Sequence, residues 1–231
     1  MSTGYRSFLI ALNKLQREGG CDWMEKSDAE KIQVLNKLVA HYGVQNWWEA
    51  ENRIQDWVST ILIQQTTSEN VEKAIKNLQP YLSVDALLEI DIKKLEELIR
   101  PAGFYRQKSQ NIKELMNWYA SHGANLETFK DWSTWDLRHE LLTIRGVGPE
   151  TADVMLIYIF ERNAFIADTY AIRLFNRLEF GPYTNYAHMH KEFNHLTEGI
   201  PHELCKEWHA CIDEHGKAYR RSGNTLDESW L

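Results

Sequence analysis

The sequence lacks the features that mark membrane proteins and disulfide-rich secreted proteins. It has no run of about 18 apolar residues, so no membrane-spanning helix is expected. Its first residues lack the apolar core of a signal peptide, and three cysteines are too few for a disulfide framework. We therefore expect a cytoplasmic globular protein, and 231 residues suffice for one large domain or two small ones.

A surplus of positive charge is also missing. The net charge is −7, whereas nucleic-acid-binding proteins usually carry a basic surface. The charges are unevenly spread, however, because acidic residues crowd positions 25–30, 85–97 and the C-terminus. The basic residues of the central region are Arg100, Arg106, Lys108, Lys113, Arg138, Arg145, Arg173 and Arg177. The sequence thus predicts a basic stripe on an acidic body, with salt-sensitive binding to nucleic acid.

Alternation of polar and apolar residues with a period of two is absent, which argues against β-strands. There is also no Gly/Ser-rich linker, no low-complexity tract and no repeat of about 20 to 50 residues. Apolar residues recur at helical spacing instead. Two such stripes are Ile54, Trp57, Val58 and Ile61, and Ala171, Leu174, Phe175 and Leu178. The fold class predicted from this pattern is all-α.

Residues 142–153, Leu-Thr-Ile-Arg-Gly-Val-Gly-Pro-Glu-Thr-Ala-Asp, predict two helices joined by a tight turn. Gly146 and Gly148 permit backbone angles closed to other residues, and Pro149 suits the first turn of a helix. That helix has an apolar stripe at Ala152, Met155, Leu156 and Ile159. The amides of Val147 and Gly148 and the first N–H groups of the helix can bind a phosphate. Spacing alone leaves open a plain connection between two helices.

From Ile144 to Leu178 the chain resembles the endonuclease III family of helix-hairpin-helix DNA glycosylases. The matching residues are Gly146-Val147-Gly148, Thr151-Ala152-Asp153 and Ala167-Asp168-Thr169-Tyr170. Further matches are residues 57–67, Arg100-Pro101-Ala102-Gly103-Phe104-Tyr105 with Lys108, and His215-Gly216-Lys217. Four motifs in the family's order make the resemblance specific. Arg145 replaces the proline usual in the family and adds a cation beside the expected phosphate site.

The resemblance implies two helical lobes with the active site in the cleft between them. Residues 46–162 would form a helical barrel that carries the hairpin (about 140–157). Residues 1–45 would pack with residues 163–231 as the second lobe, which carries the catalytic Asp168. A carboxylate there would stabilise the positive charge that builds on the sugar as the base departs, and would orient a water. An aspartate at a helix start is also typical of an N-cap, and the two roles are compatible.

Two positions narrow the expected reaction. Bifunctional relatives have a lysine where this chain has Glu150, and a carboxylate cannot form the imine that leads to strand cleavage. Adenine-mismatch relatives have an acid where this chain has Thr60, which cannot protonate a leaving base. The resemblance is therefore strongest to 3-methyladenine glycosylases, monofunctional enzymes for alkylated purines. The alternatives are a glycosylase for uracil, mismatched thymine or oxidised bases, and a non-catalytic DNA-binding protein.

The resemblance also implies a base pocket and a DNA interface. Trp47 and Trp48 would stack on a cationic base, which contributes about 2 kcal/mol when desolvated, although either can be a core residue. Lys217 would lie near the pocket entrance, or would be a surface cation at a helix end. Gln65 would fill the gap left by the extruded base, or would be a solvated residue at a helix C-terminus. The residues expected at the DNA backbone are Lys108, Arg145, Gly146, Val147, Gly148 and Thr151.

Many members of the family hold an iron–sulfur cluster on four closely spaced cysteines. Cys21, Cys205 and Cys211 are too few and too far apart, so no cluster is expected. Cys205 and Cys211 are interpreted as small buried apolar groups, without a disulfide. Hairpins of this family bind a monovalent cation through main-chain carbonyls, here those of Leu142, Ile144 and Val147. The expected partner is double-stranded DNA with a damaged base, bound by a monomer.

Overall fold

The structure, a computed structural model, describes residues 23–47 and 52–231, which are helical and contain no β-strand. The all-α prediction is therefore confirmed. The α-helices are α2 (Trp23–Tyr42), α3 (Arg53–Leu62), α4 (Ser68–Leu78), α5 (Val84–Glu89), α6 (Ile92–Leu98), α7 (Tyr105–Ser121), α8 (Thr134–Leu141), α9 (Pro149–Tyr158), α10 (Thr169–Arg177), α11 (Tyr186–Phe193) and α12 (His202–Arg221). Short 3-10 helices are η1 (Gln79–Tyr81), η2 (Arg100–Ala102), η3 (Leu126–Phe129) and η4 (Asn194–Thr197). None of the described helices is both long and apolar enough to cross a membrane.

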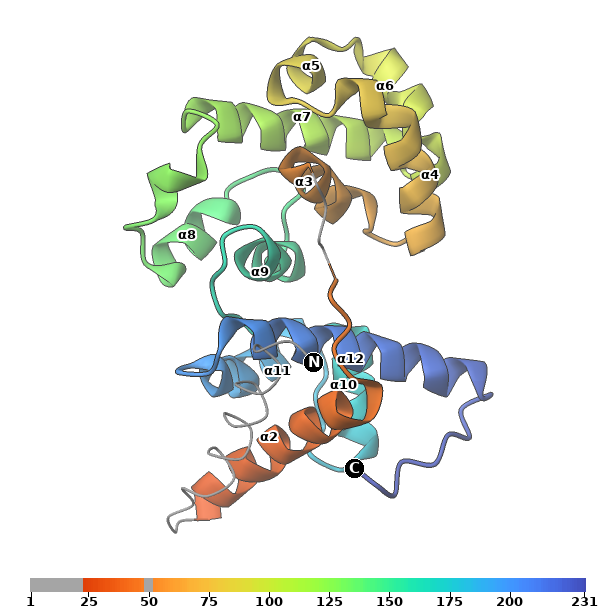
Figure 1. The fold of residues 1–231 in the computed structure, drawn as a ribbon, viewed down its shortest axis with the longest axis vertical. Coiled ribbons are helices and arrows are strands. Elements are labelled where there is room, and N and C mark those ends of the chain that lie inside the picture. The colour runs from red at the N-terminus through yellow and green to blue at the C-terminus, as the bar shows by residue number, and fades with distance from the viewer. Residues whose placement is uncertain (1–22, 48–51) are drawn as a thin grey trace, which may run out of the picture.

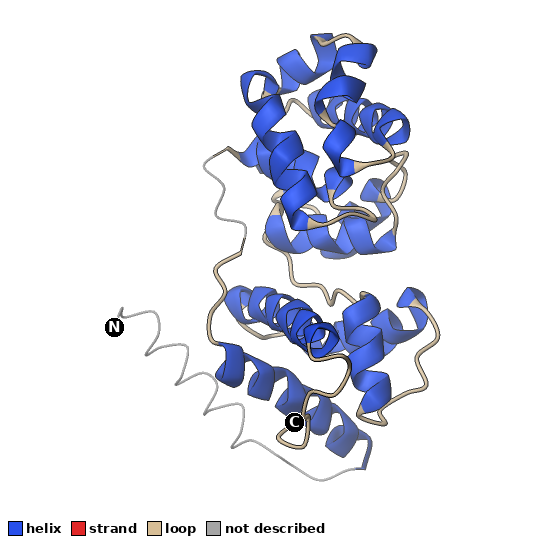
Figure 2. Ribbon diagram, turned by 90° about the vertical axis from the view of Figure 1, so that its right-hand side faces the viewer, coloured by secondary structure: helices blue, strands red, loops and turns tan. Residues whose placement is uncertain are grey.

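The helices form two groups, and each group has its own apolar core (Figure 1). The core of the first group comes from α3 to α9, and that of the second from α2, α10, α11 and α12. The chain passes between the groups after α2 and again after α9 (Figures 1 and 2). We call them the first and second lobes. The expected boundary at residue 162 falls in the second crossing, and folding of each lobe as a unit stays a prediction.

Helix α12 holds the two lobes together. Its Cys205 belongs to the core of the first lobe, whereas its Trp208 and Cys211 belong to that of the second. A second connection is Asp153 of α9, which is fully buried. Its carboxylate accepts two hydrogen bonds from Arg138 of α8, at 2.7 and 2.9 Å, and one from the Tyr186 hydroxyl of α11, at 2.7 Å. A buried charge is tolerated when it is paired and hydrogen-bonded in this way.

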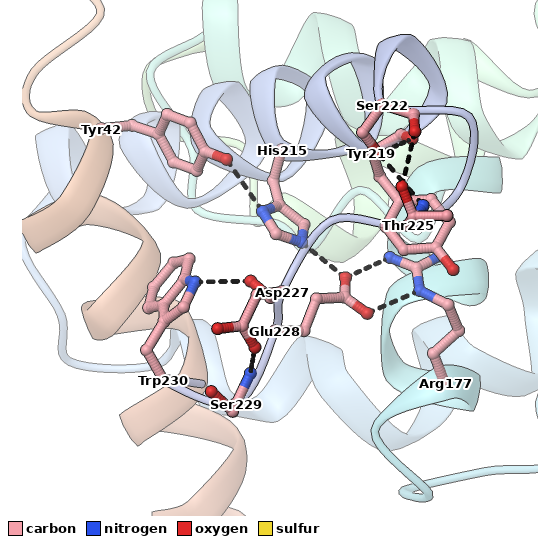
Figure 3. Close-up of polar contacts among 10 residues, drawn as sticks. All are labelled: Tyr42, Arg177, His215, Tyr219, Ser222, Thr225, Asp227, Glu228, Ser229 and Trp230. Carbon is pink, nitrogen blue, oxygen red and sulfur yellow. Dashed lines mark hydrogen bonds and ion pairs between the residues drawn. The ribbon is translucent and has the colours of Figure 1, made fainter.

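The segment after α12 folds back over the second lobe (Figure 3). Glu228 accepts hydrogen bonds from Arg177 of α10, at 2.8 Å, and from His215 Nε2 of α12, at 2.7 Å. His215 is fully buried, and its Nδ1 lies 2.9 Å from the Tyr42 hydroxyl of α2. Burial lowers the pKa of His215 despite the nearby Glu228 carboxylate. These bonds connect α2, α10 and α12 and fix α12 in place.

Candidate active site and nucleic-acid interface

The turn at Gly146 requires glycine for two reasons. Its φ of +89° lies in the left-handed region, and a Cβ there would lie 2.2 Å from the Asn111 side chain of α7. Gly148 is different, because its φ of −91° is open to any residue and a Cβ would meet no atom within 4 Å. The expectation that both glycines adopt unusual backbone angles is wrong for Gly148. Its missing side chain instead leaves open space before α9, which Pro149 begins as predicted.

The phosphate-binding donors of the hairpin also differ from the expectation. The Val147 amide donates to the Ile144 carbonyl at 3.0 Å, and the Val147 side chain is buried. Val147 is therefore not a phosphate donor as predicted, because its N–H is already used within the turn. Within the described residues, the N–H groups of Gly148 and Glu150 at the start of α9 donate to no backbone carbonyl, so they can bind an anion. Arg145 beside them is exposed.

Gln64, which the sequence analysis did not select, ties the hairpin to the end of α3. Its Nε2 donates to the Gly146 carbonyl and to the Thr151 hydroxyl, both at 3.0 Å. The hydroxyl of Thr151 therefore has a partner inside the protein. The neighbouring Gln65 is exposed in the turn after α3, with a φ of +53°. Helix α3 thus ends at Leu62, three residues before Gln65.

Lys108 does not lie at the DNA interface, contrary to the prediction. It is 3% exposed, and its Nζ donates to the carbonyls of Leu62 and Ala102, both at 2.8 Å. Burial lowers the pKa of its ammonium to about 8. Lys108 therefore holds the end of α3 against the loop that precedes α7. The tip of that loop is Phe104, which is 62% exposed and has a φ of +45°.

Asp168 is the N-cap residue of α10, and its Oδ1 accepts a hydrogen bond from the Ala171 amide at 2.8 Å. Burial, with a contribution from the negative charges of Glu150 and Asp213, raises the pKa of Asp168 to about 7. The amide bond opposes this shift but does not cancel it. Asp168 is thus an N-cap and also a carboxylate poised to titrate near neutral pH. A buried acid with a strongly raised pKa is a frequent mark of a catalytic group.

Glu150 lies in the first turn of α9, near enough to Asp168 to raise its pKa. The Glu150 side chain is exposed, but the surrounding protein partly desolvates its carboxyl group and raises the pKa of Glu150.

Thr60, the other position that defined the expected reaction, is 1% exposed. Its hydroxyl donates to the Trp57 carbonyl at 2.8 Å, inside the core of the first lobe.

The structure brings Trp47 and Lys217 together at the boundary between the lobes. The Nζ of Lys217 lies 5.0 Å from the centroid of the Trp47 ring. It also forms ion pairs with Asp213, at 2.5 Å, and Glu214, at 3.1 Å. Although burial opposes it, these carboxylates raise the pKa of Lys217 above its usual value. Trp48, the other expected pocket wall, lies outside the described residues.

A close crossing of α10 and α12 places Asp168 and Lys217 in the same region. At Gly216 of α12 a Cβ would lie 2.2 Å from the Tyr170 ring of α10, so only glycine allows this approach. Asp168 is the N-cap residue of α10, two residues before Tyr170, and Lys217 directly follows Gly216. The His-Gly-Lys motif therefore contributes a packing residue as well as a cation.

Glu207 of α12 positions Trp47, although its sequence context gives no sign of this role. It is 6% exposed, and its carboxylate accepts the amides of Gln45 at 2.8 Å and Asn46 at 3.4 Å. Asn46 has a φ of +52°, a left-handed conformation that asparagine tolerates. The buried carboxylate therefore fixes the backbone just before Trp47.

Cys205 and Cys211 are both buried on α12. Burial raises the pKa of each thiol to about 12, and Cys205 Sγ lies 3.1 Å from the Ala164 carbonyl. Their interpretation as buried apolar groups agrees with these surroundings. Cys21 lies outside the described residues, and the absence of a cluster stays a prediction.

Comparison with known proteins gives the family. The model described as "HhH-GPD superfamily base excision DNA repair protein" matches residues 58–199. The chain belongs to this superfamily. It is 40% identical over 212 residues to the "Putative DNA repair glycosylase" of Methanocaldococcus jannaschii, covering 88% of this chain and 95% of that protein. We therefore describe the protein as a DNA glycosylase of the HhH-GPD superfamily.

Two solved structures show the same fold. The Helicobacter pylori 3-methyladenine DNA glycosylase bound to 1,N6-ethenoadenine matches with a TM-score of 0.67 and 25% identity, over 80% of this chain and 96% of that one. The Schizosaccharomyces pombe 3-methyladenine DNA glycosylase in complex with abasic DNA matches with a TM-score of 0.61 and 17% identity, over 91% and 96% of the two chains. The endonuclease III-type fold is thus confirmed.

Proposed function

We propose that this glycosylase is monofunctional and hydrolyses the N-glycosidic bond of alkylated, cationic purines such as 3-methyladenine. The observation that carries the proposal is the charge around Trp47 and Asp168. Asp213 and Glu214 form ion pairs with the ammonium of Lys217, and Glu150 and Asp213 lie close enough to Asp168 to raise its pKa. Because Lys217 is already paired twice, a cationic base meets a net negative pocket. An indole face at Trp47 adds cation–π attraction for the same class of base.

The same residues argue against strand cleavage. Imine formation needs an uncharged amine, and position 150 holds a carboxylate. Lys217 is the amine at this site, but its two ion pairs raise its pKa and keep it protonated. A protonated lysine is not a nucleophile. Water is therefore the expected nucleophile, and the product is an intact abasic strand.

Asp168 performs the chemistry in this proposal. Positive charge develops on the sugar as the bond to the base breaks, and an ionised carboxylate next to it lowers the barrier. The Ala171 amide holds Oδ1 in place at 2.8 Å, which leaves Oδ2 to face the sugar and the incoming water. A base that is already cationic departs without a proton from the enzyme, so the neutral, buried Thr60 is no obstacle.

The DNA interface in this proposal combines three segments that Gln64 and Lys108 hold together. The start of α9 and the exposed Arg145 bind the backbone, whereas the exposed Gln65 and Phe104 fill the gap left by the base.

We further propose a monovalent cation at the hairpin. In the described chain no backbone N–H donates to the carbonyls of Leu142 or Val147, although that of Ile144 accepts one hydrogen bond. Such an ion would bridge these oxygens to a phosphate.

One solved neighbour supports the substrate class, because the Helicobacter pylori enzyme is named as a 3-methyladenine DNA glycosylase and is bound to 1,N6-ethenoadenine. A base-release assay on a panel of methylated, deaminated and oxidised duplexes tests the proposal. Release of 3-methyladenine is expected, without strand nicking and without a borohydride-trapped adduct. Activity on uracil with none on methylated DNA would contradict the substrate class. Efficient nicking or trapping would contradict the monofunctional mechanism.

A further inference from the structure

His209 is a partly buried titratable residue at the pocket and has no part in the proposed hydrolysis. It lies on α12 four residues before Asp213 and eight before Lys217, a spacing that puts the three on one face of the helix. Its ring meets the Trp47 ring edge-on, with centroids 5.8 Å apart and planes at 89°. His209 therefore borders the space in which the pocket places a base against Trp47.

The Tyr158 hydroxyl of the first lobe determines which ring nitrogen of His209 carries the proton. The Tyr158 hydroxyl of α9 lies 2.6 Å from His209 Nδ1, but 3.5 Å from the Lys206 carbonyl. Burial raises the pKa of Tyr158, so the phenol keeps its proton and donates it along the shorter contact. Burial and the Lys217 charge lower the pKa of His209 to about 4, so the ring is neutral. A neutral ring that accepts at Nδ1 carries its proton on Nε2.

The Nε2–H group of His209 is a hydrogen-bond donor without an acceptor among the described residues, 23–47 and 52–231. His209 also does not line the separate cavity of about 160 Å³ that Tyr158 borders with His202 and Lys206. The N–H is therefore available to a ligand that stacks against Trp47, the ring that His209 contacts.

We propose that His209 Nε2–H donates a hydrogen bond to the extruded base while Trp47 stacks on it, so that the enzyme selects bases with an acceptor on the edge facing α12. This inference rests on the proposed function, which places the base beside Trp47. Stacking and charge attract any flat cation, whereas a directed N–H distinguishes a ring nitrogen or carbonyl from a C–H. A base without the acceptor leaves a desolvated donor unpaired, which weakens its binding.

Atom-substituted free bases test the proposal. Inhibition of base release from methylated duplex is measured with 3-methyladenine and with its 1-deaza and 7-deaza analogues, in which C–H replaces one ring acceptor. For the wild-type protein one analogue should inhibit about three- to tenfold more weakly than 3-methyladenine, the range of one lost hydrogen bond. In His209→Leu that analogue and 3-methyladenine should inhibit equally. His209→Gln, which keeps an N–H donor, should restore part of the difference.

Two further variants separate recognition from structure. Tyr158→Phe keeps both rings but removes the bond that selects the tautomer, so it should reduce the difference between the two inhibitors. His188→Leu, on α11 and half-exposed, is the matched control and should keep the wild-type difference. A merely structural role of His209 would weaken all inhibitors by the same factor, and thermal melting checks that each variant is folded.

The inference fails if His209→Leu keeps the wild-type preference among the bases, or if the wild-type protein distinguishes neither analogue. Both results are obtained with a protein that releases 3-methyladenine, so they leave the proposed function intact. A wild-type protein that releases no methylated base contradicts the proposed function itself, and with it the position of the base against Trp47.

Discussion

At the scale of single residues, the protonation of Asp168 sets the expected pH dependence. Its folded-state pKa of about 7 means that the ionised form grows as pH rises through neutrality. Single-turnover base release should therefore rise about tenfold between pH 6 and pH 8, because only the ionised carboxylate stabilises the sugar cation. Asp168→Asn should bind the duplex and release no base at any pH. A flat profile for the wild-type protein would show that another group limits the reaction.

Glu150 gives a second prediction at this scale. Its negative charge is one of the causes of the raised Asp168 pKa, after burial. Glu150→Gln should therefore move the midpoint of the pH profile to lower pH, with faster release at pH 6 and little change at pH 8. Glu72→Gln, which removes the same charge from the exposed surface of α4, is the matched control. A midpoint that does not move would mean that Glu150 and Asp168 are not electrostatically coupled in solution.

At the scale of elements, the two glycines of the hairpin should respond differently to alanine. Gly146→Ala forces a left-handed φ and a contact with Asn111, so it should destabilise the protein by about 1–3 kcal/mol. Gly148→Ala meets neither obstacle and should leave unfolding unchanged, but its methyl group should weaken binding to undamaged duplex. Urea unfolding and a duplex-binding titration at fixed salt measure the two effects. Equal stability of the two variants would show that the turn accepts a side chain at position 146 without strain.

Glu207 allows a test of how α12 places Trp47. Glu207→Gln replaces one of two accepting oxygens with an NH2 group that faces a backbone N–H. Because a hydrogen bond to a charged group contributes about 1.5–3 kcal/mol, the segment before Trp47 should lose its fixed position. We expect slower base release with unchanged binding to undamaged duplex. Release at the wild-type rate would show that Trp47 is held by other contacts.

The sequence predicted the helical elements well, because periodicity is a local property. The stripe Ala152, Met155, Leu156 and Ile159 is buried as expected. Local patterns did not predict the buried position of Lys108. The family resemblance placed Lys108 near the DNA backbone, but its ammonium binds the carbonyl of Leu62, 46 residues away. No local pattern reveals that two distant segments have carbonyls in need of a donor.

The pocket was predictable only in part, for the same physical reason. Trp47 and Lys217 were selected by resemblance, and the structure does bring them together. Glu207, His209 and Tyr158 were missed because each acts on a partner far along the chain. The Glu207 contact with Gln45 spans 162 positions. A charged residue in the middle of an amphipathic helix is usually solvated, so burial of Glu207 leaves no sign in the sequence.

At the scale of the whole molecule, the first lobe is built from consecutive helices, whereas the second combines α2 with helices from the far end of the chain. Tyr42 of α2 and His215 of α12 are in contact although 173 residues separate them. Contacts between distant segments form late, because closing the intervening chain costs entropy first. In refolding followed by pulsed hydrogen exchange, the amides of α3 to α9 should be protected before those of α2. Simultaneous protection would mean that the lobes fold together.

This arrangement has a consequence for synthesis in the cell. At about 5–20 residues per second, the ribosome needs on the order of 10–30 s to make the chain between Tyr42 and His215. During that time α2 has emerged, but α12, which packs against it, does not yet exist. The nascent protein therefore carries an amphipathic helix whose apolar face has no partner until α12 is complete. For this glycosylase, α2 is the place where a chaperone would act and where aggregation would begin.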